Sequence, residues 1–161
     1  MTRIDALLTY LNDHLGGSVG AIEVVEKIAA REKNSALGGT CEQLHRDITA
    51  DQSVVQQLIA GLGGSESTTK KAGAWVAEKL ARLKLSTDIG SMGVTLVEEL
   101  ETLALGIHGK LGLWTALEHL AGATNDPRLA ALDYPALQKR AQTQHDLVDR
   151  LRKEAVLAAF R

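Results

Sequence analysis

The sequence predicts an all-α fold, and three observations lead to it. Apolar residues recur at spacings of three and four along most of the chain, which is typical of helices with one buried face. The good helix formers Ala, Leu, Glu, Lys and Gln dominate the composition. Only 3% of the residues are aromatic and only 2 are prolines, which disfavours a β-sandwich or barrel. A length of 161 residues is that of one domain, so we expect residues 1–161 to form a single domain. A hydrophobic fraction of 45% is ordinary for a globular protein.

The first predicted helix covers residues 4–35. Its apolar positions are spaced alternately by four and three, which places them on one stripe facing a partner helix. We expect Gly38 and Gly39 to break this helix and Thr40 to cap the next one. The stripe consists of Ile4, Leu8, Leu11, Leu15, Ser18, Ile22, Val25 and Ala29.

The second predicted helix covers residues 41–62 and ends at Gly63 and Gly64. A shorter helix is expected over residues 70–85, followed by a loop over residues 86–93. The stripe of the second helix consists of Cys41, Leu44, Ile48, Asp51, Val55, Leu58 and Leu62.

Two further long helices complete the pattern. One is expected over residues 94–120, and the last begins near Tyr134 and Pro135, a first-turn position that proline tolerates. Residues 122–133 form a loop with one short turn. Four long helices with a small helix in one longer crossover match the ferritin-like four-helix bundle. The two stripes are Leu96, Leu100, Leu103, Ile107, Leu111, Trp114 and Leu117, and then Leu137, Ala141, Gln144, Val148, Leu151, Ala155 and Ala158.

Three short motifs carry a resemblance to a known family. They are Tyr10-Leu11-Asn12-Asp13 in the first helix, Leu62-Gly63-Gly64 at the end of the second, and Lys70-Lys71-Ala72-Gly73-Ala74 opening the crossover helix. In segment order and length, most of the chain resembles the stress-associated YciF-like branch of the ferritin-like superfamily. The resemblance implies a ferritin-like bundle and an association with stress.

Iron-binding members of this superfamily carry a carboxylate on each of two helices and a Glu-x-x-His or similar pair on each of the other two. Such centres need several anionic oxygens and imidazoles that converge in the middle of the bundle. The matching positions here retain one carboxylate, so we expect no di-iron centre and no cofactor. Those positions are Ser18, Ile48, Asp51, Gly106 or Ile107, Ala141 and Gln144.

Three polar residues interrupt the apolar stripes: Ser18, Asp51 and Gln144. We interpret them as a hydrogen-bonded layer across the core that fixes the register of the helices. A small-ligand pocket or a single weak metal site is the alternative. A buried carboxylate needs donors, and Ser18 and Gln144 can supply some of them.

Histidines supply the remaining metal candidates. His14, His45, His108 and His145 fall on four different helices, but His45 precedes Asp51 by six positions, roughly 9 Å along a helix. The alternative function is therefore a divergent metal-binding oxidoreductase or iron-handling protein that uses Asp51, His108 and His145. Glu42 and His45 have the spacing of a ligand pair but are expected on the surface.

The lone cysteine and the charged clusters receive structural interpretations. Cys41 is expected to be a small core residue, with a thiolate activated by a helix N-terminus as the alternative. The basic residues of the crossover helix and the acidic ones of the next helix are expected on solvated faces, where ion pairs are weak. These residues are Lys70, Lys71, Lys79, Arg82 and Lys84, and then Glu98, Glu99 and Glu101.

Glycines occur inside two predicted helices, where each costs up to about 1 kcal/mol relative to alanine. We expect close packing of these two helices to offset that cost, with a dimer contact or space for a ligand as alternatives. No strand precedes either set, which excludes a phosphate-binding loop. Lys110 and His108 exclude a membrane dimerisation motif. The glycines are Gly16, Gly17, Gly20, Gly106, Gly109 and Gly112.

The remaining features restrict the function. A net charge of −2 and a pI of about 6.2 argue against nucleic acid or an anionic membrane as partners. No apolar run reaches the roughly 20 residues that span a bilayer, and the start lacks the apolar region of a signal peptide, so we expect a cytoplasmic protein. We expect a non-catalytic homodimer that acts through self-association or through a partner or ligand. A third interpretation is a small-ligand carrier with a pocket beside Ser18 and Gly106.

Overall fold

Helices account for almost all of the chain that the structure describes. The computed structural model describes residues 2–65 and 92–161, and within these ranges it contains no strand, which confirms the all-α prediction. The crossover helix expected over residues 70–85, with its basic cluster, lies outside the described residues. The helices are α1 (Arg3–Arg31), α2 (Ala36–Gly61), α4 (Met92–Thr124), α5 (Pro127–Ala130) and α6 (Tyr134–Phe160).

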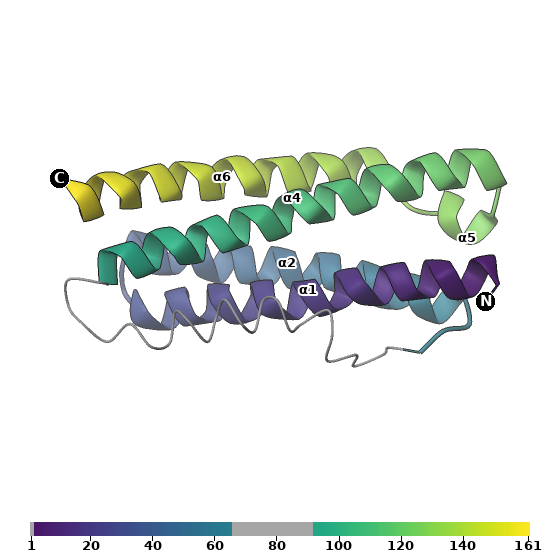
Figure 1. Ribbon diagram of the computed structural model, residues 1–161, viewed down its shortest axis with the longest axis horizontal. Helices are drawn as coiled ribbons and strands as arrows, with labels where there is room; N and C mark the ends of the chain where they lie inside the picture. The colour runs from purple at the N-terminus through teal and green to yellow at the C-terminus, as the bar shows by residue number, and fades with distance from the viewer. Residues whose placement is uncertain (1, 66–91) are drawn as a thin grey trace.

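The four long helices lie side by side as two antiparallel pairs (Figure 1). Helix α1 pairs with α2, and α4 pairs with α6. Helix α4 also packs against α1, which joins the two pairs. The end of α2 and the start of α4 lie at opposite ends of the molecule, so these two helices run in the same direction.

The apolar stripes pack into two core clusters, one toward each end of the helices. The cluster at the α1–α2 turn includes Ile28, Leu44 and Leu100, and the other cluster surrounds Trp114, which is completely buried. Burial of each such large side chain contributes roughly 1.5–3 kcal/mol to folding. Most stripe residues are buried or half-buried as the spacing of three and four predicts, but Ala158 is exposed. The buried residues Val24, Ile59 and Leu113 lie outside the predicted stripes.

The turn between α1 and α2 does not lie where the sequence predicted it. Helix α1 ends at Arg31, and Asn34 adopts a left-handed conformation with φ 69°. The Ser35 hydroxyl then caps α2 by accepting from the Gly38 amide at 3.1 Å. The predicted break at Gly38 and Gly39 and the predicted cap at Thr40 are wrong, because all three residues lie inside the first turns of α2.

The second pair of long helices is closer to prediction. Helix α4 covers residues 92–124 and extends beyond the expected 94–120 at both ends. The short turn expected in the following loop is α5, which begins at Pro127 after its cap Asp126. Helix α6 starts at Tyr134 as predicted, and the Asp133 carboxylate caps it by accepting from the Ala136 amide at 3.0 Å. Among the helices of the described ranges, none is both long and apolar enough to cross a membrane.

Candidate functional site

A cluster of charged and polar side chains crosses the middle of the helices. Asp51 of α2 is only 2% exposed, and its carboxylate accepts from Lys110 Nζ at 2.6 Å and from Gln144 Nε2 at 3.3 Å. Arg140 of α6 also donates to Asp51, and Lys110 donates to the Gln144 side-chain oxygen. We call these four residues the polar layer. It connects α2, α4 and α6.

The structure therefore brings together two of the three expected layer residues, Asp51 and Gln144. Ser18 is not bonded to them: its hydroxyl donates to the Leu15 carbonyl at 2.6 Å and accepts from Gln52 Nε2 at 2.9 Å. Ser18 thus links α1 to α2, one residue along α2 from Asp51.

Sequence reasoning missed the two cations of the layer. Lys110 and Arg140 lie beside the apolar stripes of α4 and α6, not on them. A signal was available, because Lys110 follows the buried Ile107 by three positions and so lies on the same face of α4. A carboxylate on a buried stripe requires a cation, and Lys110 is a basic residue on such a face.

The charges of the layer are unequal. One carboxylate faces two cations, Lys110 with a side chain 14% exposed and Arg140 with one 40% exposed. Burial lowers the pKa of Lys110, and the charge and hydrogen bond of Asp51 act in the opposite direction. The layer carries an excess of positive charge, and its least solvated cation is Lys110.

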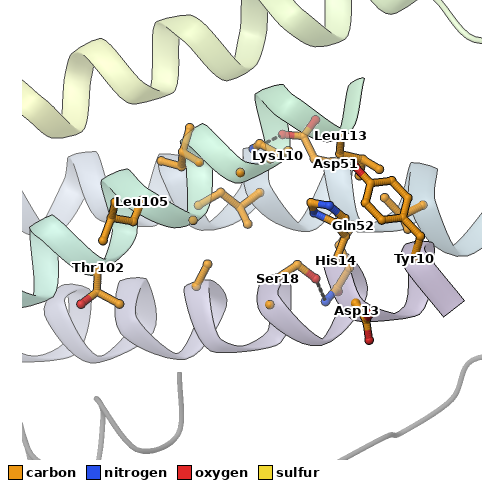
Figure 2. Close-up of a pocket in the computed structure, with 17 residues that line it drawn as sticks. Tyr10, Asp13, His14, Ser18, Asp51, Gln52, Thr102, Leu105, Lys110 and Leu113 are labelled. Carbon is orange, nitrogen blue, oxygen red and sulfur yellow. Dashed lines mark hydrogen bonds and ion pairs between the residues drawn. The ribbon is translucent and has the colours of Figure 1, made fainter. Parts of the chain in front are cut away.

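Beside the polar layer lies a cavity of about 570 Å³ between α1, α2 and α4 (Figure 2). Its volume is within the range of small-molecule sites, and its walls are mostly apolar. The Lys110–Asp51 and Ser18–Gln52 contacts lie in its middle, with Leu105 toward one end and Tyr10 toward the other. We call this cavity the α1–α4 groove. It is lined by Tyr10, Asp13, His14, Gly17, Ser18, Ala21, Ile48, Asp51, Gln52, Val55, Thr102, Leu105, Gly106, Ile107, Gly109, Lys110 and Leu113.

Four of the six helix-interior glycines leave space beside them and make no close contact with another helix. A side chain at Gly17, Gly109 or Gly112 would meet nothing within 4 Å, and one at Gly106 would meet only Ala21 Cβ at 3.9 Å. The expectation of close packing is therefore wrong for these four positions. Gly17, Gly106 and Gly109 line the α1–α4 groove, so their missing side chains are part of the reason it is open. The other two, Gly16 and Gly20, are half-buried and buried within α1.

The metal candidates do not converge. The rings of His108 and His145 do lie side by side, with centroids 5.9 Å apart, but the Asp51 carboxylate is bonded to the cations of the layer. Within residues 2–65 and 92–161, no three His, Cys, Asp or Glu side chains form a group that could hold a metal ion. The structure therefore does not bring Asp51, His108 and His145 together as a metal site.

The other histidines have separate environments. His45 is half-buried and lies 2.9 Å from Glu26 of α1, and Glu42 is exposed as expected. The ring of His14 contacts Tyr10 edge-on, with centroids 4.7 Å apart, and burial lowers its pKa. His119 is exposed on α4.

A second buried carboxylate, Glu99, contradicts the expectation of a solvated acidic face. Its side chain is completely buried and accepts from Arg31 Nη2 at 2.7 Å and from Arg31 Nη1 at 3.2 Å, with Lys27 Nζ at 3.3 Å. Glu98 and Glu101, its neighbours on α4, are exposed as expected. The sequence did not identify Glu99 because its partners lie on a helix 68 residues away.

Cys41 is completely buried near this ion pair. Burial raises the pKa of its thiol to about 11, so the group is protonated at neutral pH and is a poor nucleophile. This environment agrees with the expected small core residue and not with an activated thiolate.

Comparison of the chain with protein-family models, with curated proteins and with solved structures found no match.

Proposed function

We propose that this protein is a non-catalytic helical bundle of the ferritin-like type that binds a small amphipathic molecule in the α1–α4 groove. The observation that carries the proposal is the groove itself, a largely apolar cavity with the half-buried Lys110 in its wall. Ligand sites of soluble proteins have this make-up: apolar walls and a few polar groups that orient the ligand. Lys110, Ser18 and Gln52 are among the polar groups of this wall and lie near its middle.

The helix order supports the ferritin-like part of the proposal. Two antiparallel pairs with α2 and α4 in the same direction are the arrangement expected from a single long crossover. At the centre, where iron-binding relatives would place their ligands, this chain has Asp51 neutralised by Lys110 and Arg140. We therefore propose a ligand carrier in place of an iron enzyme. The cytoplasmic location and the stress association stay part of this proposal and are based on the sequence alone.

The glycines support a ligand over a tight contact between helices. Gly17 on α1 and Gly109 on α4 both line the groove, and both have open space where a side chain would be. Relative to alanine, each glycine lowers the stability of a helix by up to about 1 kcal/mol. An empty cavity beside the glycine provides no contacts that compensate for this loss. A bound molecule would offset it.

The proposal is tested by filling the groove. Wild type should bind the neutral fluorescent probe N-phenyl-1-naphthylamine saturably at one site per chain, and Gly109→Leu should abolish this binding. Gly112→Leu is the matched control, because Gly112 is on the same helix with the same open space but does not line the groove. Equal probe binding by both variants would contradict the proposal.

Self-association is measured in the same samples by sedimentation. The expected homodimer is compatible with ligand binding if wild type and Gly109→Leu have the same mass. A wild-type dimer that Gly109→Leu converts to a monomer would show instead that a second copy of the chain occupies the groove.

A further inference from the structure

We infer that the ligand of the α1–α4 groove is a linear amphipathic carboxylate whose head binds Lys110. The inference rests on the proposed function, because it names the chemical class that this same groove accepts. It follows from the unused hydrogen-bonding capacity of the lysine, from the charge of the polar layer and from the shape of the groove on either side of it.

The hydrogen bonds of the layer require an acceptor on the ligand. The Lys110 ammonium has three N–H donors, and two of them are used by Asp51 and the Gln144 side-chain oxygen. Lys110 also lines the groove, so its third donor is available to a molecule bound there. The Asp51 carboxylate already accepts from three side chains and has little capacity left for a ligand that donates.

The charge of the layer favours a negative head close to Lys110. Asp51 faces both Lys110 and Arg140, so the cluster carries one more positive charge than negative. Two further carboxylates lie near the layer. Asp47 also acts on Lys110 but bonds exposed Gln43, and Asp13 at the groove is exposed, so solvent screens both more than it screens Lys110. Burial lowers the pKa of His14, which favours its neutral ring. A carboxylate beside Lys110 would balance the layer and compensate the burial of the ammonium. A cationic head would add a third positive charge.

The walls require an unbranched apolar tail. From Lys110 the groove continues along α4 to Thr102, eight positions or about 12 Å away. Ala21, Leu105, Gly106 and Ile107 line this stretch, and the small residues among them leave width for a chain of methylene groups. Figure 2 shows Leu105 and Thr102 at the end of the groove away from Tyr10.

Three ligands with the same tail and different heads test the inference by titration calorimetry on the full chain: decanoate, decanol and decylamine. We expect decanoate to bind wild type at least about 10-fold more tightly than decanol, as one charge-assisted hydrogen bond provides. Decylamine should bind more weakly than decanol. Equal affinities for decanoate and decanol, or a preference for decylamine, would overturn the inference.

Substitution of the lysine supplies the second readout. Lys110→Met should lower the affinity for decanoate about 10-fold and change the affinity for decanol by no more than about twofold. The control is Lys139→Met, which removes the same charge from an exposed position on α6 and should change neither affinity. If Lys110→Met leaves Asp51 too poorly compensated to fold, the neutral pair Asp51→Asn with Lys110→Met replaces it, with the same expected loss of preference for decanoate.

Failure of the inference and failure of the proposed function give different results. If N-phenyl-1-naphthylamine and decanol bind but decanoate has no advantage, the groove binds ligands and the assignment of a carboxylate is wrong. If neither the probe nor any of the three ligands binds, the groove is not a ligand site and both are wrong.

Discussion

Arg31 at the end of α1 and Glu99 in α4 form a bidentate ion pair across the interface between the two helix pairs. The guanidinium donates through Nη2 and Nη1 to separate oxygens of the carboxylate, at 2.7 and 3.2 Å. Glu99 is completely buried, and Lys27 provides a second cation at 3.3 Å. Since a buried carboxylate is tolerated only when it is compensated, this pair fixes how α4 lies against α1.

Removing the charge of Glu99 should destabilise the fold. Glu99→Gln retains the shape but loses the charge-assisted bonds to Arg31, and we expect the free energy of unfolding to fall by about 2 kcal/mol. Urea denaturation followed by circular dichroism measures the change. Glu98→Gln, one residue away and exposed, should change it by less than about 0.5 kcal/mol. Equal effects of the two substitutions would show that Glu99 is not compensated as described.

The polar layer should behave as a coupled unit. Asp51→Asn leaves Lys110 and Arg140 facing each other without a carboxylate, and we expect it to cost about 3 kcal/mol. Adding Lys110→Met should restore part of that loss, with a coupling free energy of about 1 kcal/mol or more. The control is Asp146→Asn, at an exposed position on α6, where the carboxylate accepts from Gln142 Nε2 at 2.8 Å. It should change the free energy of unfolding by less than about 0.5 kcal/mol. If the effects of Asp51→Asn and Lys110→Met on the free energy of unfolding are strictly additive, the two residues are not coupled and the polar layer is not a unit.

Two adjacent glycines in the first turn of α2 should respond in opposite directions. A Cβ at Gly38 would lie 2.3 Å from the backbone oxygen of Glu32, whereas one at Gly39 would meet nothing within 4 Å. We expect Gly38→Ala to lower the thermal midpoint. Gly39→Ala should raise the stability by up to about 1 kcal/mol, the helix-propensity difference. Stabilisation by both substitutions would place the turn elsewhere.

The stability should depend on pH through His14. Burial lowers its pKa below the ordinary 6.5, so between these values the unfolded chain binds more protons than the folded one. The free energy of unfolding therefore falls as the pH drops from about 7 through 6.5 toward the folded-state pKa. His14→Gln should flatten this dependence in urea titrations, and His119→Gln, at an exposed position, should not. An unchanged slope for His14→Gln would mean that the imidazole is solvated in the folded protein.

The sequence was sufficient to predict the helices but not the ion pairs that join them. Apolar stripes identify α1, α2, α4 and α6 because each helix must bury one face, and Asp51 and Gln144 were found because they interrupt such stripes. Lys110 and Glu99 were missed because their surroundings come from other helices. A spacing pattern records only the faces of one helix, and long charged side chains beside a stripe can be either solvated or buried.

The turn between α1 and α2 shows a different limit. Gly38 and Gly39 have the composition of a break, but the chain reverses at Asn34, which adopts the left-handed conformation, and Ser35 caps the next helix. Both residue types are known turn and cap formers, so the signal was present. In the sequence, Gly38-Gly39 is a competing turn signal. Only the structure shows that Gly38 packs against the Glu32 carbonyl inside α2, so that Asn34 and Ser35 make the turn.

The short link between α1 and α2 has a consequence for the order of folding. Contacts within each antiparallel pair span fewer residues than contacts between the pairs: the Ser18–Gln52 and Lys110–Gln144 bonds each span 34. Either hairpin can therefore form at a smaller cost in loop-closure entropy than their docking. The ion pairs of Arg31 with Glu99 and of Asp51 with Arg140 span 68 and 89 residues. We therefore expect two hairpins to form early and their docking to be the slow step. Substitutions in these ion pairs would then report on that docking, and substitutions in the helix caps on the earlier events.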